Sequence, residues 1–562
     1  CRDQQRPSMV RDRLENPRKG DLTMMRIHYW AVCVLMAWAI VATASCAPDL
    51  PTDAAQGADV ARAFRAQAER LRQAGDPQAA LVYESKADQC DLVLIGYRSR
   101  AATATELRSY YTGQKGEPIY GCYIGVHCFR DERVTNSFTE FCNLTRKRHA
   151  MIFDYARKDD IDAHMWEAGD RKGPFLQSAF EPGDLRKIVP GPDLENWARA
   201  LGGVGRTVFL RWGSEMNGDW LKWHGDPKLY IEKWRLVHDT MERLAPNVAM
   251  VWCPNATPQL QIDCYYPGDD YVDWVGVNFY VVTIHDGDKR YSARNENPAD
   301  LFKHVYAKYA SRKPIMICET GVTHKAQGVN TTEIDFAANR IGHLYGCLPR
   351  LYPRLKAICY YDVDNIKNTD ANRNLNNYLI TDSERLLDAY CQAIAPDYFL
   401  SAEQKPDDPL PEYVEPLANG QTLSGKVTLS AWAKSLIIAP VVEYRLDGKV
   451  LGTSCDPGTY NFEFDCTAVT PGAHVLALAM LDQNGGRVLK QVNYKINVGT
   501  VVAGTPKPTS PPAAGPAQTL TPGTSNASVT EDAKLVAKKG FGAPEGAATN
   551  VTGKGKGCKN QK

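Results

Sequence analysis

The sequence predicts a protein of the α/β class, a (β/α)8 TIM barrel with a C-terminal all-β, immunoglobulin-like sandwich. Between residues 115 and 400, eight short apolar runs alternate with segments of helical periodicity, the pattern of eight strand–helix units. A doubly wound sheet is the alternative, but no glycine-rich phosphate loop follows the first run. From residue 418 to 499 apolar and polar residues alternate as in strands, and Asp447-Gly448 is a hairpin turn pair.

Length and composition set further bounds. A chain of 562 residues is expected to hold two or more domains, and a hydrophobic content of 44% suffices for a large core. Lys and Arg number 66 against 65 Asp and Glu, a net charge of +1. This balance lacks the strongly basic face of a nucleic-acid-binding protein, so we expect no nucleic acid partner. No Cys-x-x-Cys pair occurs and no histidines have helix-face spacing, so we expect no metal and no cofactor.

Composition shifts divide the chain into segments. Proline- and acid-rich sequence marks one linker, and Pro, Thr, Gly and Ala mark a second. We expect an upstream, non-native leader at 1–23, a signal peptide at 24–45, a helical segment at 46–114, the barrel at 115–400, a linker at 401–417, the sandwich at 418–499, and a low-complexity linker with a basic disordered tail at 500–562. For the sandwich, a spacer or stabilising role is favoured over sugar binding, because no aromatic platform is visible in it.

The predicted signal peptide indicates export. Arg26 precedes an apolar run at residues 29–44, and small residues follow at the cut. Cleavage after Ala44 would give a secreted protein. Ala44-Ser45-Cys46 also resembles a bacterial lipoprotein box, although Thr43 stands where an aliphatic residue is usual. We therefore expect either a secreted protein or a cell-surface, outer-membrane lipoprotein attached through lipidated Cys46. In an oxidising compartment, Cys455–Cys466, Cys253–Cys264 and Cys128–Cys142 are candidate local disulfides by spacing.

Two acids stand at the ends of apolar runs. The eight barrel strands are expected at residues 118–125, 149–155, 173–182, 207–212, 248–255, 272–280, 314–319 and 355–362. Glu215 follows the fourth, and Glu319 ends the seventh. In a barrel of this kind the carboxyl ends of the strands form the active face, so the two acids should meet there. A pair of carboxylates is what glycoside hydrolysis requires.

Polar and aromatic residues at the same strand ends suit a sugar ligand. Asn217, Asn255 and Asn278 are expected to bond ring hydroxyls, and aromatic rings to stack on sugar faces, although core packing is about as common for a single Trp. The predicted substrate-binding residues are Arg211, Ser214, Asn217, Trp220, Glu181, Trp252, Asn255, Tyr280 and Tyr361.

Taken together, the strand ends resemble glycoside hydrolase family 26, a retaining family of the large barrel clan that includes the β-mannanases. The resemblance rests on Glu181-Pro182, Arg211 with the Glu-Met-Asn-Gly run at 215–218, Trp252-Cys253-Pro254-Asn255, the sixth strand at 274–280, and Glu319-Thr320-Gly321. It implies that Glu215 is the acid/base and Glu319 the nucleophile. One position departs from the family pattern, because Ser214 stands where the family usually has a sugar-contacting His.

The resemblance implies a secreted, retaining endo-β-glycan hydrolase, mannan endo-1,4-β-mannosidase-like, with two Glu residues in a double displacement. The alternatives are a β-1,3-/1,4-glucanase or β-1,3-xylanase of the same family, or a non-catalytic glycan-binding barrel. The expected partner is a β-linked polysaccharide or oligosaccharide, and the chain is expected to be a monomer. A retaining mechanism predicts carboxyl groups about 5–5.5 Å apart.

Overall fold

The computed structural model describes residues 50, 56–156, 175–369, 373–405, 407–436, 439–482 and 486–499. The predicted leader, signal peptide, lipidated Cys46 and basic tail lie outside the described residues. Within those ranges, no helix combines the length and the apolar character needed to cross a bilayer.

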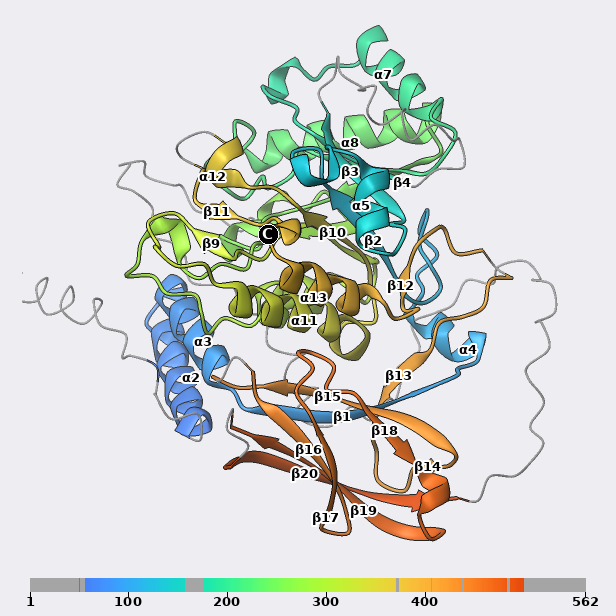
Figure 1. Ribbon diagram of the computed structural model, residues 1–562. Helices are drawn as coiled ribbons and strands as arrows, with labels where there is room; N and C mark the ends of the chain where they lie inside the picture. Colours follow the sequence, from blue (N-terminus) through green and yellow to red (C-terminus); the bar gives the residue numbers. More distant parts are fainter. Residues whose placement is uncertain are drawn as a thin grey trace, which may run out of the picture. The chain divides into compact units, whose positions relative to one another are not determined.

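Eight parallel strands form a closed barrel, as the sequence predicts (Figure 1). They are β2 (Cys122–His127), β3 (Met151–Ala156), β4 (Phe175–Phe180), β5 (Val208–Trp212), β6 (Val248–Trp252), β7 (Trp274–Asn278), β8 (Ile315–Thr320) and β10 (Leu355–Tyr361). The ring closes where β10 pairs with β2, with Ala357 opposite Tyr123. A short ninth strand, β12 (Phe399–Leu400), adds in parallel to β2 at Cys122.

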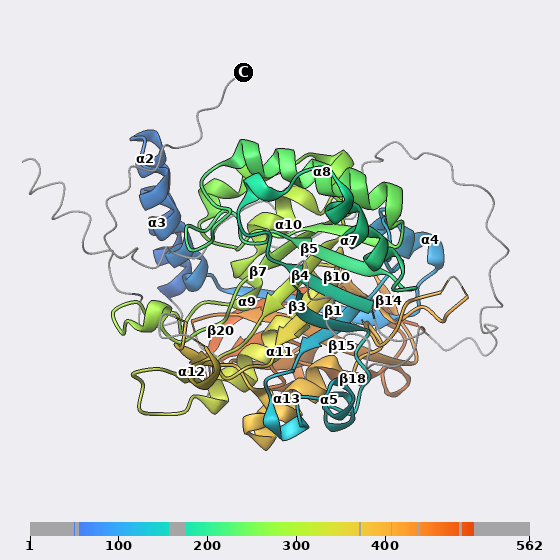
Figure 2. The same cartoon turned by 90° about the horizontal axis from the view of Figure 1, so that it is seen from above.

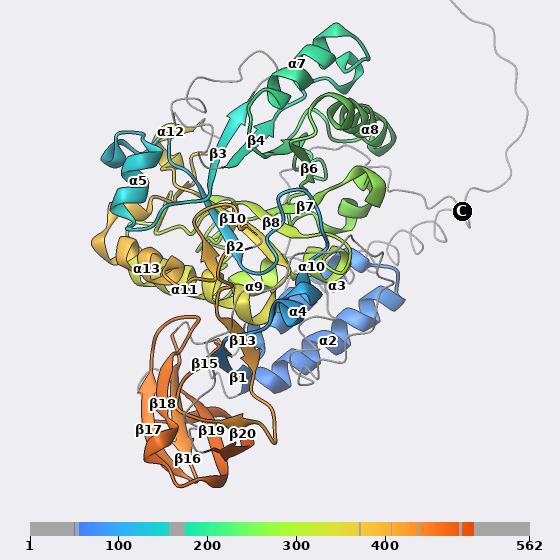
Figure 3. The ribbon, with the colours of Figure 1, turned by 90° about the vertical axis from the view of Figure 1, so that its right-hand side faces the viewer.

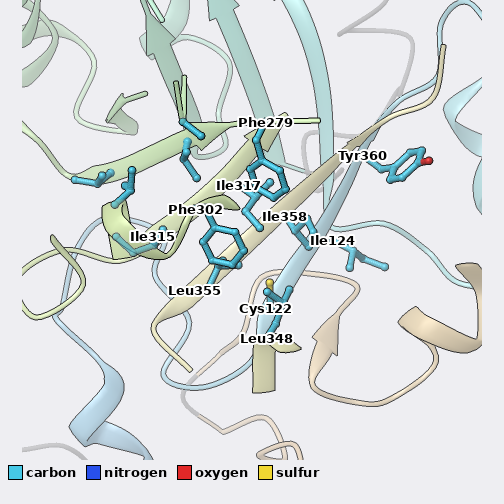
Figure 4. Close-up of a cluster of buried hydrophobic side chains, with 14 of the residues drawn as sticks. Cys122, Ile124, Phe279, Phe302, Ile315, Ile317, Leu348, Leu355, Ile358 and Tyr360 are labelled. Atoms are coloured by element: carbon cyan, nitrogen blue, oxygen red, sulfur yellow. The ribbon is translucent and has the colours of Figure 1, made fainter. Parts of the chain in front are cut away.

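Alternation along each strand separates two cores. On β2, Tyr123 points into the barrel interior, where it joins Phe153, Phe209 and Trp274. Its neighbour Ile124 belongs to the outer core between strands and helices. Figure 4 shows part of this outer core, in which Ile315, Ile317 and Leu355 gather around Phe302.

Helices surround the strands in the view of Figure 2. They are α5 (Phe138–Leu144), α7 (Pro192–Gly202), α8 (Pro227–Leu244), α9 (Pro298–Leu301), α10 (Lys303–Tyr309), α11 (Ile334–Leu351) and α13 (Glu384–Ile394), with short α12 (Asn365–Asn368) after β10. α8 illustrates why such segments are helical. Asp226 caps its first turn by accepting from Leu229 N, and a proline fills the first helical position. Tyr230, Trp234 and Val237 are buried at helical spacing and cover the barrel.

The N-terminal segment differs from the expectation that residues 46–114 are helical. Helices α2 (Gly57–Gln73) and α3 (Pro77–Cys90) are present, and α4 (Ala104–Leu107) is a single turn. Between α3 and α4, however, lies β1 (Val93–Arg100). Its first five residues are buried, and a short, continuously apolar run of this kind is stable as a strand inside a sheet.

The C-terminal residues form two sheets, and β1 is part of one of them. Strand order is β13–β1–β15–β18 in the first sheet and β14–β20–β19–β16–β17 in the second. The strands are β13 (Tyr413–Pro416), β14 (Thr422–Leu423), β15 (Lys426–Lys434), β16 (Val441–Leu446), β17 (Lys449–Ser454), β18 (Phe462–Asp465), β19 (Gly472–Leu481) and β20 (Val488–Val498). Figures 1 and 3 show β1, in blue, beside the orange β15. We call these two sheets the β module. The barrel is thus inserted between the first strand of the β module and the rest of it.

The β module confirms the all-β expectation for residues 418–499, while its immunoglobulin-like classification stays a prediction. The hairpin between β16 and β17 turns at Asp447 and Gly448, both at positive φ, as the sequence predicts. The predicted linker at 401–417 differs, because it contains β13, which pairs with β1. Leu429, Tyr444 and Leu478 fill the core between the two sheets.

The β module packs closely on the barrel. Gly342 and Gly346 lie one helical turn apart on α11, where an added Cβ would come within 2.5 Å of Pro457 O and 2.3 Å of Gly458 O. Only glycine allows the two backbones to approach this far. Beside this contact, Lys434 of β15 pairs with Asp300 of the barrel domain, and both side chains are largely buried.

Candidate active site

Glu215 lies in a tight turn directly after β5. Its φ is 57° and that of Gly213 is 54°, so two residues of the turn adopt the left-handed region. For a residue with a Cβ this conformation costs about 1 kcal/mol or more, and such strain is concentrated at functional sites. The turn is anchored by the Glu215 N–H, which donates to Cys253 O over 2.8 Å. The strained backbone therefore fixes where the carboxylate points.

Three side-chain donors hold the Glu215 carboxylate. Asn278 Nδ2 donates to Oε1 over 2.7 Å, Asn255 Nδ2 donates to the same oxygen over 3.1 Å, and Trp220 Nε1 donates to Oε2 over 2.9 Å. Glu215 itself remains partly exposed. The Trp220 ring is 47% exposed and lies against Gly218, where an added Cβ would overlap the ring. This arrangement presents an indole face to solvent immediately beside the acid, which suits stacking on a sugar ring.

Glu319 lies near the end of β8 and is only 7% exposed. Arg211 Nη2 on β5 donates to Oε2 over 2.8 Å, and the Tyr280 hydroxyl donates to Oε1. The buried guanidinium also lies over the rings of Phe153 and Tyr155, at 4.7 and 5.8 Å from the centroids. Burial lowers the pKa of Arg211, but the Glu319 carboxylate together with Cys253, Tyr155 and Cys318 raises this pKa well above its ordinary value. A permanent cation and a hydroxyl thus stabilise negative charge on Glu319.

Asn278 connects the two acids. Its Nδ2 donates to Glu215, while its Oδ1 accepts from Arg211 Nη1 over 2.9 Å. Because Arg211 also donates to Glu319, a continuous chain of hydrogen bonds runs from Glu215 through Asn278 and Arg211 to Glu319. Sheet register explains the meeting, because Asn278 lies opposite Glu319 on β8 and bridges to Asn255 on its other side. The predicted pair of acids is therefore brought to one end of the barrel and linked.

The structure buries two of the predicted substrate-binding residues. Trp252 is fully buried, and its Nε1 donates to Tyr265 O over 3.1 Å. As the last residue of β6 it points outward into the core under the helices, away from the barrel mouth. Asn217 is also fully buried, with its amide bonded to the backbone of Asn255 and Pro258. It holds the loop that carries Asn255 and has no side-chain atom left for a sugar.

The remaining predicted substrate-binding residues lie at or near the strand ends and differ in what they contact. Asn255 and Asn278 each donate one amide hydrogen to Glu215, so both side chains orient the acid. Ser214 is half-buried, and its carbonyl accepts from Trp223 Nε1 over 2.8 Å. Tyr361 lies 5.9 Å from the Tyr280 ring, at the same strand ends. Glu181 follows β4, is exposed, and takes no part in the hydrogen bonds that join the two acids.

His127 was missed by the sequence prediction. It ends β2, where the predicted first strand stopped two residues earlier, at Gly125. Its ring stacks on Tyr361 at 5.5 Å with planes 9° apart, and Nδ1 donates to Phe153 O over 3.1 Å. Burial lowers the pKa of His127 to about 4, so the ring is neutral near pH 7. Tyr155, 40% exposed and in contact with His127, was missed as well. A polar residue ending an apolar run was the available signal for His127.

The predicted local disulfides are not formed. Cys128, Cys142, Cys253, Cys455 and Cys466 have free thiols, so none of the three expected pairs is joined. Among the described residues, no group of three or more His, Cys, Asp and Glu side chains is arranged to hold a metal ion.

Comparison with known proteins shows similarity to one family of hydrolases over part of the chain. Residues 193–339, which include Glu215 and Glu319, match the family model described as glycosyl hydrolase family 26. A β-1,3-xylanase from Vibrio sp. is 34% identical over 108 residues, 17% of this chain and 23% of that protein. A β-1,3-xylanase from Alcaligenes sp. is 32% identical over 108 residues, 17% and 22% of the two chains. The chain thus spans less than a quarter of the length of these curated relatives. The structure of a family 26 β-mannanase from Bacteroides ovatus is 14% identical, with a TM-score of 0.36, and covers 53% of this chain and 95% of that one.

Proposed function

We propose that this chain, which carries the glycosyl hydrolase family 26 signature at residues 193–339, is a retaining endo-β-glycan hydrolase. The observation that carries the proposal is the hydrogen-bonded chain from Glu215 through Asn278 and Arg211 to Glu319. It holds two carboxylates in different surroundings, one beside a buried cation and the other beside amides and an exposed indole. Different surroundings are what two carboxylates need to take different roles.

The reaction would take two displacements at the anomeric carbon. Glu319, oriented by Arg211 and Tyr280, attacks the anomeric carbon and forms a glycosyl-enzyme bond. Glu215 gives its proton to the glycosidic oxygen, and the leaving chain departs as an alcohol. In the second step Glu215 takes a proton from water, whose oxygen attacks the same carbon and releases Glu319. The exposed Trp220 ring, bonded to Glu215, is placed to stack on the sugar of the leaving chain.

We propose β-1,3-xylan as the first substrate to test, because the two curated relatives at 34% and 32% identity are named β-1,3-xylanases. Mannan is the second candidate, and the family resemblance supports it. Ser214 distinguishes the two candidate substrates only weakly. Its side chain is shorter than the His that the family usually has at this position, so the site beside the acid has more room and lacks one group that can carry a positive charge.

A glycan-binding barrel without catalysis is the competing interpretation. The strained φ of Glu215 and the buried cation beside Glu319 speak against it, because a binding protein gains nothing from either. A direct test incubates the purified chain with β-1,3-xylan, mannan and mixed-linkage glucan and follows new reducing ends. Release from one polymer, with the β-anomer formed first in the NMR spectrum, is expected. Binding without release from any polymer would support the non-catalytic barrel instead.

Two variants test the assigned roles. Glu319→Ala should abolish turnover, and added azide should restore it with the inverted α-glycosyl azide as product. Glu215→Ala should retain the first step on aryl glycosides with good leaving groups, and azide should then give the β-glycosyl azide. A β-glycosyl azide from Glu319→Ala and an α-glycosyl azide from Glu215→Ala would instead make Glu215 the nucleophile and Glu319 the acid/base.

We also propose that the chain is exported and works as a monomer, with Cys46 as a lipid anchor. The predicted signal peptide supports export, and the lipoprotein box supports the anchor. Expression of the full chain in a bacterium, followed by membrane fractionation of the parent and of Cys46→Ala, tests the anchor. A parent chain found in the soluble fraction would favour plain secretion.

A further inference from the structure

Two buried thiols meet beside the pair of acids. Cys253 directly follows β6, and Cys318 lies on β8 immediately before Glu319. Both side chains are fully buried. Strand β7 runs between β6 and β8 and carries Gly276 beside the two thiols. A Cβ at Gly276 would lie 2.4 Å from Cys318 Sγ and 3.0 Å from Cys253 Sγ. The glycine therefore leaves the space in which the two sulfur atoms lie.

Cys253 touches the supports of the proposed acid/base. Its carbonyl accepts from the Glu215 N–H over 2.8 Å. Its Sγ lies 3.1 Å from Asn278 Oδ1, the oxygen that also accepts from Arg211. Burial raises the pKa of the Cys253 thiol well above its ordinary value, so the thiol keeps its proton and is able to donate. Cys318 reaches a different acceptor, the carbonyl of Met316, and makes no hydrogen bond to Asn278.

The orientation of the Asn278 amide depends on these donors. With Oδ1 facing Arg211 and Cys253, the NH2 group faces Glu215, and each contact pairs a donor with an acceptor. A flipped amide would place its NH2 against the guanidinium and the thiol, and its oxygen against the carboxylate. The contacts with the guanidinium and with the carboxylate would then be repulsive.

We infer that Cys253 is a positioning residue for the proposed hydrolase, because its thiol fixes the Asn278 side chain that orients Glu215 relative to Glu319. The inference rests on the proposed function. It assigns the thiol an indirect role, through Asn278, and no contact with substrate.

Three variants test the inference. Cys253→Ala removes the donor and should lower kcat about tenfold with little change in KM, the loss typical of one hydrogen bond made to a catalytic support. Cys253→Ser keeps a donor and should stay within about threefold of the parent. Cys318→Ala removes the other thiol from the same pocket without reaching Asn278, and should also stay within about threefold. Equal losses in Cys253→Ala and Cys318→Ala would show that packing alone matters and would overturn the inference.

A double-mutant cycle between Cys253 and Asn278 distinguishes a positioning role of the thiol from a merely structural one. In an Asn278→Ala background, Cys253→Ala should lower kcat no further, and the alkaline limb of the pH profile, which reports loss of the Glu215 proton, should shift in each single variant alike. Independent, additive losses would contradict the inference.

A crystal structure of Cys253→Ala separates this inference from the proposed function. A rotated or doubly positioned Asn278 amide supports the positioning role even where no glycan is cleaved. An unchanged, fully ordered amide overturns the positioning role. Absence of turnover in the parent chain would instead count against the hydrolase proposal alone.

Discussion

Arg211 Nη2 donates to Glu319 Oε2 over 2.8 Å, although the two residues lie on β5 and β8 with two strands between them. Both side chains are nearly excluded from solvent. Such a pair contributes little net stability compared with apolar residues of the same size, but breaking it leaves one buried charge uncompensated. The ion pair therefore identifies the position at which a single substitution should most affect both stability and turnover.

Arg211→Met should lower the free energy of unfolding by about 3–5 kcal/mol, because Glu319 would keep a buried charge without its partner. Turnover should fall at least a hundredfold. Urea unfolding and kcat on the cleaved glycan measure the two effects. Arg235→Met is the control, since Arg235 is exposed and lies over the Tyr271 ring, away from the acids. A small stability change and intact turnover are expected there. Intact turnover in Arg211→Met would contradict the assigned role of the ion pair.

Asn278→Asp should be more harmful than Asn278→Ala. The new carboxylate would lie about where Nδ2 now donates to Glu215, so two negative charges would face each other at hydrogen-bond distance. We expect kcat to fall about tenfold in Asn278→Ala and further in Asn278→Asp, with a changed pH profile in the latter. Asn247→Ala is the control: its amide donates to two backbone carbonyls, Leu201 O and Arg206 O, outside the site. Its loss should lower stability and leave kcat unchanged.

Trp220 and Trp252 should respond oppositely to substitution. Trp220→Ala removes an exposed ring and should raise KM for the polysaccharide several-fold, while Trp220→Phe keeps a ring, loses the bond to Glu215 and should lower kcat about fivefold. Trp252→Phe shortens a fully buried ring and should destabilise the fold by about 1–3 kcal/mol without affecting KM. A raised KM in Trp252→Phe would restore its predicted place in the substrate site. Steady-state kinetics measure the changes in KM and kcat, and thermal unfolding measures the change in stability.

His149 should make the fold sensitive to acid. The ring is fully buried, with Nε2 accepting from the Tyr390 hydroxyl over 2.8 Å. Burial lowers its pKa to about 3, whereas an unfolded chain binds that proton near pH 6.5. Between these values the unfolded state holds more protons, so stability falls as pH falls below 6.5, by up to roughly 1.4 kcal/mol per pH unit for this group.

His149→Phe should therefore reduce the loss of stability between pH 7 and pH 5, measured by urea unfolding at pH 5, 6, 7 and 8. Tyr390→Phe removes the partner but keeps the titrating ring. It should lower stability at every pH and keep the pH dependence. The same pH dependence in His149→Phe and in the parent would refute the assignment.

Gly346→Ala tests the contact between α11 and the β module. Alanine favours a helix by about 1 kcal/mol over glycine, but its Cβ would lie 2.3 Å from Gly458 O. Overlap with a backbone atom should outweigh propensity, and we expect a net loss of about 1–3 kcal/mol. Gly203→Ala, at the end of α7 where the nearest atom would be 3.4 Å away, should change stability by less than about 1 kcal/mol. Equal thermal midpoints for both variants would show that the contact between α11 and the β module adjusts to the added methyl group.

The sequence predicted the barrel and its two acids because both depend on local signals. Each barrel strand is an apolar run bounded by turns, and each acid sits where such a run ends. The burial of Trp252 could not be predicted in this way. Whether the last residue of a strand points to the mouth or to the helices depends on the strand register, and a shift of one residue reverses it. Neighbouring strands decide this, as β8 does for Asn278 by pairing it with Glu319.

β1 could not be predicted for a different reason. The run Val93-Leu94-Ile95 follows two helices and has no turn partner nearby, and its neighbours in the sheet are residues of β13 and β15. Likewise, Asn278 was expected to bond sugar hydroxyls, and only the positions of Glu215 and Arg211 reveal that its amide is already used.

The insertion of the barrel between β1 and the rest of the β module has a consequence for synthesis. Tyr97 pairs with Ser430, so β1 leaves the ribosome more than 300 residues before its neighbouring strand. At about 5–20 residues per second the delay is some tens of seconds. During it the apolar β1 has two unpaired edges, which invite pairing with other chains. Nascent chains of this protein are therefore expected to depend on chaperones until residue 434 has emerged, while the barrel between the two strands completes its own ring.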